Sequence, residues 1–479
     1  MTRFAHCIAT RLRRWSIGCL AIAALSPLTG QAQSASARNV VVLIGSGLGP
    51  TTTTATRSMR YKDDGRLTVD TMPNVARLRT WALDAQTSDS AAAVSALLTG
   101  IKVRNDVVAM NGDTRSGGFA PGKDPIRSVA NAENHCPASG NGSASQTLLE
   151  LAIARKKASG IVTTGRLTSG PAAAAYAHVC HRGAEQEVAR QAVPGGAGYN
   201  AALGKGVDVM LGGVSSGWRP FDAAKRMRGR PDGRELVGEL QTAGYTFVTD
   251  LTGLDAAPTA HSRLIGLFDF ADDQGGMSFE LDRDPKREPS LAAMTAKALD
   301  VLSTNPDGFV LVVEAGRIED AMQAGSARRA LFDAMAFDDA VRTVLERVDL
   351  DRTLVVATGG RDSSMALIGG ARRGSDVLGL HLDAVSGKPD VDAGGVPYTS
   401  LVFGGGNRPD RRTTLDSPTA LQRDYLQEGA IRLTAGGAGK ANGSGGDVVL
   451  WAAGRGAASF HGTIDNTRVF TLIRAAMGP

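Results

Sequence analysis

The sequence predicts an α/β protein built on a large, doubly wound, mostly parallel sheet that is flanked by helices. Short apolar runs of strand length recur along the chain, and they are continuous rather than alternating, as expected for strands buried on both faces. Helical patterns lie between these runs, and strands that alternate with helices favour a parallel sheet. The expected strands are residues 40–44, 160–162, 207–211, 309–313, 354–356, 401–403 and 448–451, and the expected helices are residues 146–157, 289–302, 327–348 and 466–477.

The composition indicates a globular chain. Of 479 residues, 42% are hydrophobic and 21% are charged, which excludes a disordered chain, a small disulfide-stapled domain and a polytopic membrane protein. The 59 glycines follow no collagen-like period, so we expect them in turns and loops. We therefore expect residues 33–479 to form a single domain with glycine-rich insertions, of which residues 404–446 are one.

Residues 1–32 have the features of a secretory signal peptide. A basic stretch at residues 11–14 precedes an apolar run at residues 15–28, and Gly-Gln-Ala at residues 30–32 suits a cleavage site. A single membrane anchor is the alternative, but Pro27 interrupts the run, which is shorter than the ~20 residues that span a bilayer. We expect a periplasmic or secreted protein with no membrane span after the signal is removed.

Removal of this segment also changes the charge of the chain. The segment holds four arginines and no acid, and without it the basic and acidic residues are nearly balanced. No basic run suited to a phosphate backbone appears elsewhere, so nucleic acid is not an expected partner.

The mature chain keeps Cys136 and Cys180. In an oxidising compartment these could form one disulfide, and two buried free thiols are the alternative.

Four segments at the expected strand ends hold the residues that could carry chemistry, because ligands bind at the carboxyl ends of strands in doubly wound sheets. They are residues 43–49, 87–92, 312–317 and 357–362. The first is glycine-rich but lacks the spacing and the acid of a dinucleotide fingerprint. In the second, Asp89 and Ser90 precede a helix of small residues. At such a helix N-terminus Ser90 could attack a bound phosphoryl group or could simply cap the helix.

From residue 39 to the C-terminus the chain resembles the alkaline phosphatase family. The motifs that carry the resemblance are residues 39–45 (Asn-Val-Val-Val-Leu-Ile-Gly), 89–91 (Asp-Ser-Ala), 99–102 (Thr-Gly-Ile-Lys) with Asn105, 171–173 (Pro-Ala-Ala), 176–178 (Tyr-Ala-His), 288–291 (Glu-Pro-Ser-Leu), 313–314 (Val-Glu), 337–341 (Phe-Asp-Asp-Ala-Val) and 461–463 (His-Gly-Thr). The resemblance implies a serine nucleophile that becomes phosphorylated, an arginine that clamps phosphate oxygens, two zinc ions and one magnesium ion. It also suggests a homodimer.

Part of the family's site is present in this chain. The resemblance places the nucleophile at Ser90, directly after Asp89, and the phosphate clamp at Arg182. It places the acidic magnesium ligand at Glu314. The catalytic residues expected on this basis are Ser90, Arg182 and Asp89.

Most of the metal ligands that the resemblance implies are replaced. Neutral residues or a cation stand where the family has carboxylates and imidazoles, and the aspartate that binds one zinc ion becomes the longer Glu319. None of the seven histidines lies in a ligand segment, and His178 and His461 match positions that bind no metal in the family. The replaced positions are Ser46, Thr168, Gly170, Gln323, Gly360, Arg361 and Gly443.

These replacements predict a degenerate metal site. Without zinc, an aliphatic hydroxyl stays protonated near neutral pH, and binding the ground state alone gives no acceleration. We therefore expect a pseudophosphatase that binds phosphate or phosphate esters through Ser90, Arg182 and Arg361, with no cofactor.

Two alternatives stay open. The first is an active phosphomonoesterase of the alkaline phosphatase type, with Ser90 as nucleophile and a rearranged metal set. Its oxygen ligands would be Glu314, Glu319, Asp320 and Asp362, which suit Mg²⁺, Ca²⁺ or Mn²⁺ better than zinc. Glu314 and Glu319 would then hold Mg²⁺. The second alternative is an envelope structural or interaction protein that keeps the fold and binds no ligand.

Overall fold

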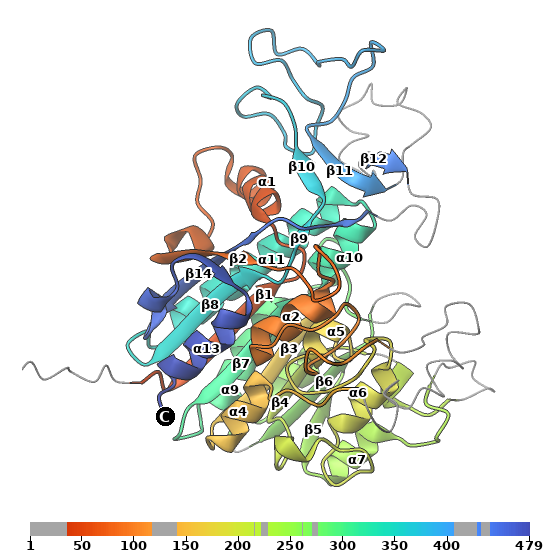
Figure 1. Cartoon of the computed structure of the whole chain (residues 1–479), viewed down its shortest axis with the longest axis vertical. Coiled ribbons are helices and arrows are strands. Elements are labelled where there is room, and N and C mark those ends of the chain that lie inside the picture. Colours follow the sequence, from red (N-terminus) through yellow and green to blue (C-terminus); the bar gives the residue numbers. More distant parts are fainter. Residues whose placement is uncertain are drawn as a thin grey trace, which may run out of the picture. The chain divides into compact units, whose positions relative to one another are not determined.

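A ten-stranded sheet is the central element of the structure, with the strand order β15-β2-β14-β8-β1-β7-β3-β4-β6-β5 (Figure 1). Neighbouring strands are parallel except where β14 pairs with β8 and with β2. The predicted fold class is confirmed. The strands are β1 (Asn39–Gly45), β2 (Asn74–Arg79), β3 (Ala158–Arg166), β4 (Val209–Gly213), β5 (Tyr245–Val248), β6 (Arg263–Phe268), β7 (Phe309–Ala315), β8 (Thr353–Gly359), β14 (Val448–Gly454) and β15 (Gly462–Asp465).

The structure, a computed structural model, describes residues 36–116, 141–214, 216–221, 229–260, 262–270, 276–406, 429–432 and 441–479. All of them belong to one compact unit, Ser36–Pro479. The predicted signal peptide, Cys136 and most of the glycine-rich insertion lie outside the described residues, so the domain boundaries stay predictions. Within the described ranges, no helix is both long enough and apolar enough to cross a membrane.

Helices cover both faces of the sheet, which explains why its strands read as continuous apolar runs. Along β1, Val40, Val42 and Ile44 join one apolar cluster, whereas Val41 and Leu43 join a second cluster on the other face. Helices α2, α4 and α13 pack into the first cluster, and α1, α9 and α11 pack into the second. The helices are α1 (Pro50–Tyr61), α2 (Ser90–Thr99), α4 (Leu148–Ala154), α5 (Gly170–Ala173), α6 (Glu185–Gln191), α7 (Leu236–Thr242), α8 (Leu251–Ala256), α9 (Leu291–Leu302), α10 (Arg317–Gln323), α11 (Ala327–Arg347) and α13 (Thr467–Ala476), with short 3₁₀ turns η1 (Val69–Thr71), η2 (Ala201–Leu203), η3 (Ser216–Trp218) and η5 (Ala457–Ser459).

Two smaller sheets lie outside the main one. The first contains β10 (Met365–Leu367), β11 (Leu401–Gly406) and β12 (Gly429–Arg432), so the apolar run at residues 401–403 forms a strand but does not join the ten-stranded sheet. The reason is its pairing, which is antiparallel with β10 and parallel with β12. The second is the two-stranded pair of β9 (Asp362–Ser363) and β13 (Gly443–Ser444), which matters for the site described below.

The register of the central strands brings three of the four predicted segments together. The last residue of β1, Gly45, pairs with Ala315 at the end of β7 and with Gly359 at the end of β8. The loops that begin at Ser46, Gly316 and Gly360 therefore start side by side at one edge of the sheet. This is the edge at which a doubly wound sheet binds its ligands.

Candidate functional site

Helix α2 begins at this edge, and its first residue is Ser90. Asp89 is the N-cap, and its carboxylate accepts hydrogen bonds from the backbone N–H groups of Ala92 and Asp106, each at 2.7 Å. The aspartate therefore caps the helix, and Ser90 occupies the first helical position, with 1% of its surface exposed. The capping alternative holds for Asp89 rather than for Ser90.

Arg182 lies directly over Ser90. Its Nη1 donates to Ser90 Oγ at 3.1 Å and lies 3.5 Å from Asp89 Oδ2. The approach is close because Gly170 separates the two segments: a Cβ at Gly170 would lie 2.7 Å from the Cβ of Ala91 and 3.2 Å from that of Arg182. Burial lowers the pKa of Arg182, but the negative charges of Asp89, Glu319 and Asp106 outweigh this effect and raise it, so the guanidinium stays charged.

A second arginine occupies the place where the family resemblance puts zinc ligands. Arg361, which follows β8, donates from Nε at 3.0 Å and from Nη2 at 2.7 Å to Glu319 Oε1 on α10. Gln323 Nε2, one turn further along α10, donates to the same oxygen at 3.0 Å. Arg361 Nη1 completes the arrangement with a 3.3 Å hydrogen bond to the carbonyl oxygen of Ser88. Both ionic partners are buried, with 9% of Arg361 and 6% of Glu319 exposed.

Gly443 leaves the space that the Arg361 guanidinium fills. Pairing of β13 with β9 places Gly443 opposite Ser363, two residues after Arg361. A Cβ on Gly443 would lie 1.9 Å from Arg361 Nη1, far inside van der Waals contact. The arginine and the glycine are therefore complementary, and a histidine at residue 443 could not share this space with the guanidinium.

Glu314 at the end of β7 holds two hydroxyl groups instead of charged partners. Ser46 Oγ donates to its Oε1 at 2.9 Å, and Thr163 Oγ1 donates to its Oε2 at 2.5 Å. Burial raises the pKa of Glu314 to about 7, although these hydrogen bonds oppose the shift. Sequence reasoning missed Thr163; its only signal is the register of β3 on β7, which pairs Thr163 with Glu314.

The other residues considered for the metal site each have a hydrogen-bond or ionic partner of their own. Asp320 forms an ion pair with Arg317 at 2.9 Å. Asp362 accepts from the backbone N–H of Ser363 at 2.9 Å and packs against Gly49, where a Cβ would lie 1.5 Å from Asp362 Oδ1. Burial raises the pKa of Asp362. Thr168 Oγ1 donates to Glu185 at 2.5 Å.

The residues present do not fit a two-zinc site. Of the positions that the resemblance assigns to zinc, Glu319 is neutralised by Arg361, Gln323 offers an amide, and Gly443 has no side chain. Zinc prefers imidazole, thiolate and carboxylate ligands, and a fixed cation in their midst repels a dication. In the part of the chain that the structure describes, no three His, Cys, Asp or Glu side chains gather as a metal-binding group.

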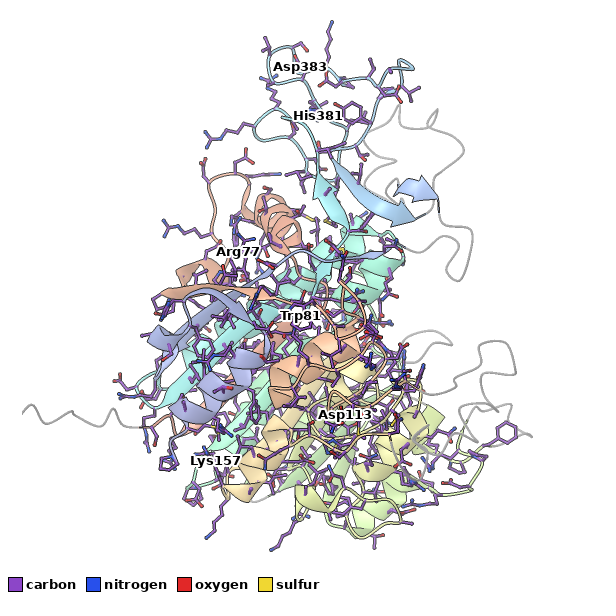
Figure 2. All side chains as sticks on the ribbon, viewed as in Figure 1. Arg77, Trp81, Asp113, Lys157, His381 and Asp383 are labelled. Atoms are coloured by element: carbon purple, nitrogen blue, oxygen red, sulfur yellow. The ribbon has the colours of Figure 1, made fainter. Side chains whose placement is uncertain are left out.

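Two further residues can be placed. Cys180, close to Arg182 in the chain, is disulfide-bonded, and Cys136 lies outside the described residues. His381 lies in the segment between β10 and β11, apart from the strand ends that form the site (Figure 2). Its ring packs against Tyr398 with the ring centroids 5.1 Å apart.

Comparisons with known proteins agree with this architecture. Residues 37–478 match the alkaline phosphatase family. The alkaline phosphatase of Gadus morhua is 28% identical over 455 residues, which cover 89% of this chain and 88% of the relative. The tissue-nonspecific isozyme of alkaline phosphatase from Gallus gallus is 31% identical over 398 residues, covering 77% of this chain and 71% of the relative.

Solved structures share the fold. The alkaline phosphatase of Thermus thermophilus superposes with a TM-score of 0.64 at 22% identity and covers 92% of each chain. The cold-active alkaline phosphatase of Shewanella sp. gives a TM-score of 0.62 at 20% identity, covering 92% of this chain and 100% of that one. Together with the match over residues 37–478, these comparisons show that the chain belongs to the alkaline phosphatase family.

Proposed function

We propose that the protein is an exported pseudophosphatase, which binds phosphate or phosphate esters at Ser90 and Arg182 and does not hydrolyse them. The observation that carries this proposal is the buried pair of Arg361 and Glu319 in the space left by Gly443. The pair uses an acidic side chain that a metal would need, and its two charges neutralise each other. Arg361 remains the third anion-binding residue of the proposal, and it would meet an anion while it is paired with Glu319.

The proposed phosphate site combines a helix terminus with a guanidinium. Helix α2 runs for 10 residues from Ser90, and its first N–H groups and its dipole favour an anion. Arg182 keeps 31% of its side chain exposed, so an incoming anion can reach it. A guanidinium presents parallel N–H donors to phosphate oxygens, which makes it a strong partner for such a ligand.

Among the residues that the structure describes, no base is in hydrogen-bond contact with Ser90 Oγ. Its partner there is Arg182, and a guanidinium donates hydrogen bonds but has no lone pair that can accept a proton. A serine needs an adjacent base or a metal to become a nucleophile near neutral pH. Asp89 is committed to two backbone N–H groups as the cap of α2. These contacts support binding without turnover.

Elemental analysis of the mature protein, combined with aryl-phosphate hydrolysis across added Zn²⁺, Mg²⁺, Mn²⁺ and Ca²⁺, tests the proposal. We expect no stoichiometric zinc and the same background hydrolysis for the wild type and for Ser90→Ala. Hydrolysis that any of these ions supports, and that Ser90→Ala abolishes, would contradict the proposal. The chain would then be a working phosphomonoesterase.

One observation favours that second candidate. Glu314, Ser46 and Thr163 place carboxylate and hydroxyl oxygens together at the ends of β1, β7 and β3, and oxygen ligands suit Mg²⁺. Glu319 could join them only by leaving Arg361. Aryl-phosphate hydrolysis measured with added Mg²⁺ tests this second candidate. A Glu314→Gln variant should abolish any turnover that Mg²⁺ supports.

The structural or interaction role is separated from the first proposal by titration with inorganic phosphate. Phosphate uptake that is lost in Arg182→Ala supports binding at the proposed site. No uptake by the wild type would leave only the structural role. The proposal also includes export to the periplasm or the medium and assembly as a homodimer. Secretion of the full chain with cleavage after residue 32 would support export.

A further inference from the structure

We propose that the anion site selects tetrahedral esters with a single negative charge, phosphodiesters or sulfate monoesters, over the dianions of phosphate monoesters, and that Asp106 is a specificity-determining residue for this choice. The inference rests on the phosphate-binding function proposed above and narrows its ligand class. The observation that carries it is the balance of charge around Arg182.

Arg182 already faces two carboxylates. Its Nη1 lies 3.5 Å from Asp89 Oδ2, and its backbone N–H donates to the Asp106 carbonyl oxygen at 2.6 Å. The Asp106 N–H donates in turn to Asp89 Oδ2 at 2.7 Å, so the two acidic residues lie next to each other. Both negative charges help to raise the pKa of Arg182. A bound anion would therefore share one guanidinium with two carboxylates.

The charge of Asp106 has little to balance it. Within the described ranges, its ionic contact below 4 Å is with His181, whose Nε2 lies 3.9 Å from Asp106 Oδ2. Burial and the charge of Arg182 lower the pKa of His181, so the ring is neutral at about pH 8. Burial and the charge of Asp89 raise the pKa of Asp106 from its usual value of about 4, as expected where negative charge is in excess. The Asp106 side chain is 47% exposed, so its carboxylate lies at the surface beside the site.

The other arginines at this edge of the sheet are each paired with an acid, and each pair adds no net charge. The pairs are Arg361 with Glu319 at 2.7 Å, Arg166 with Glu185 at 2.8 Å and Arg317 with Asp320 at 2.9 Å. Glu314 has hydroxyl partners and, when it is ionised, can only add negative charge. The unbalanced groups around the site are therefore one guanidinium and two carboxylates.

This balance disfavours a doubly charged ligand. The resemblance implies metal ions that would balance a dianion, and the residues present here do not fit the two zinc ions. Each further negative charge on a ligand meets a net negative surrounding and also has to give up more hydration. A singly charged ester avoids this second charge and keeps at least two oxygens that can accept from Arg182 and from the first N–H groups of α2.

The charge of Asp106 can be removed without changing the backbone. Asp106 is in the left-handed region with φ of 67°, which asparagine adopts more readily than most residues. Asp106→Asn keeps the size of the side chain and both backbone bonds, to Asp89 and to Arg182. Asp383→Asn is the matched control, because it also removes one carboxylate but lies between β10 and β11, apart from the strand ends that form the site (Figure 2).

Calorimetric titration at pH 8 with three probes tests the inference. Phenyl phosphate is a dianion there, because its second pKa is about 6. Phenyl sulfate has the same shape with one charge less, and methyl phenyl phosphate is a singly charged diester. We expect both singly charged probes to bind the wild type about threefold more tightly than phenyl phosphate, the effect of one partly exposed charge interaction. A preference shown by one of them alone identifies the ligand as a sulfate monoester or as a phosphodiester.

Asp106→Asn should increase the affinity for every probe, because one repulsive charge is removed. We expect an increase of about threefold for the singly charged probes and about tenfold for phenyl phosphate, which carries twice the charge. The preference of the wild type should therefore disappear. Asp383→Asn should leave all three affinities unchanged. A gain in affinity also separates this role from a structural one, since a loss of folding stability cannot tighten binding.

The contrary outcomes are distinct. If the wild type binds neither the three probes nor inorganic phosphate, the proposed function fails, and this inference fails with it. If phenyl phosphate binds at least as tightly as both singly charged probes, the inference fails while phosphate binding stands. A preference that Asp106→Asn leaves unchanged would overturn the role of Asp106. Should Asp106→Asn not fold, Asp106→Gly also accepts a left-handed backbone and gives the same test.

Discussion

Gly443→Ala is expected to disrupt the buried pair of Arg361 and Glu319 without touching either residue. Gly443 is not in the left-handed region, so its backbone accepts an alanine. The added Cβ would lie 1.9 Å from Arg361 Nη1, whereas real Cβ atoms essentially never come within 3.0 Å of another heavy atom. The guanidinium must therefore move by at least about 1 Å, and its bonds to Glu319 at 2.7 and 3.0 Å leave no slack for such a movement.

The loss of folding stability follows from the contacts that Glu319 would lose when the Arg361 guanidinium moves. Glu319 would keep one partner, Gln323, in a buried position, and breaking a buried ion pair costs about 3–5 kcal/mol when one charge stays uncompensated. Because Arg361 moves away rather than disappearing, we expect the lower end, about 3 kcal/mol. Gly445→Ala is a matched control in the same segment, since its Cβ would meet Thr87 Oγ1 at 3.4 Å in ordinary contact and should cost less than about 0.5 kcal/mol.

Urea unfolding of a double-mutant cycle measures the coupling. Arg361→Ala removes the guanidinium, so the further change Gly443→Ala should then cost nearly nothing. The coupling energy should therefore approach the whole cost of the single substitution. If Gly443→Ala lowered the free energy of unfolding equally in the wild type and in Arg361→Ala, the idea that the Arg361 guanidinium needs the space at Gly443 would be refuted.

Three further predictions concern other parts of the molecule. Arg182→Ala should weaken phosphate binding about 30-fold in equilibrium dialysis, since a charged hydrogen bond is lost, and Arg182→Lys should restore only part of the affinity; unchanged binding would place the phosphate elsewhere. Asp89→Ala should lower the free energy of unfolding by about 1–2 kcal/mol in urea, because α2 loses its cap, and no change would mean that the cap is dispensable. Burial raises the pKa of Asp333 well above its ordinary value, so the stability that its protonated form provides is complete below about pH 4 and is lost as the pH rises. Asp333→Asn should thus raise Tm at pH 8 and not at pH 4, and a variant less stable than the wild type at both values would contradict this.

Local patterns were sufficient to predict the central strands. The apolar run of β1 is continuous because its alternate residues enter two different clusters, and the same holds for the buried strands β7 and β8. The predicted strands missed β2, because its residues alternate between buried and exposed and give no apolar run. They also missed β5, β6 and β15. Of these, β15 is a short edge strand whose first two residues are exposed.

The candidate site was predictable in its residues but not in its contacts. The loss of zinc ligands can be seen at Arg361 and Gly443 separately, yet nothing in the sequence indicates that the guanidinium fills the space above the glycine. That contact depends on the pairing of β9 with β13, strands of two residues each with no pattern to detect. Thr163 was missed for a similar reason, since a buried threonine in a strand is ordinary until the register places it on Glu314.

A crystal structure of the mature protein grown with excess zinc and phosphate, with data collected at the zinc absorption edge, tests the central claim most directly. The account predicts phosphate oxygens on Arg182 and Ser90, the Arg361 guanidinium still on Glu319, and no anomalous peak beside either. Two anomalous peaks near Ser90, with Glu319 turned from Arg361 to bind one of them, would contradict it.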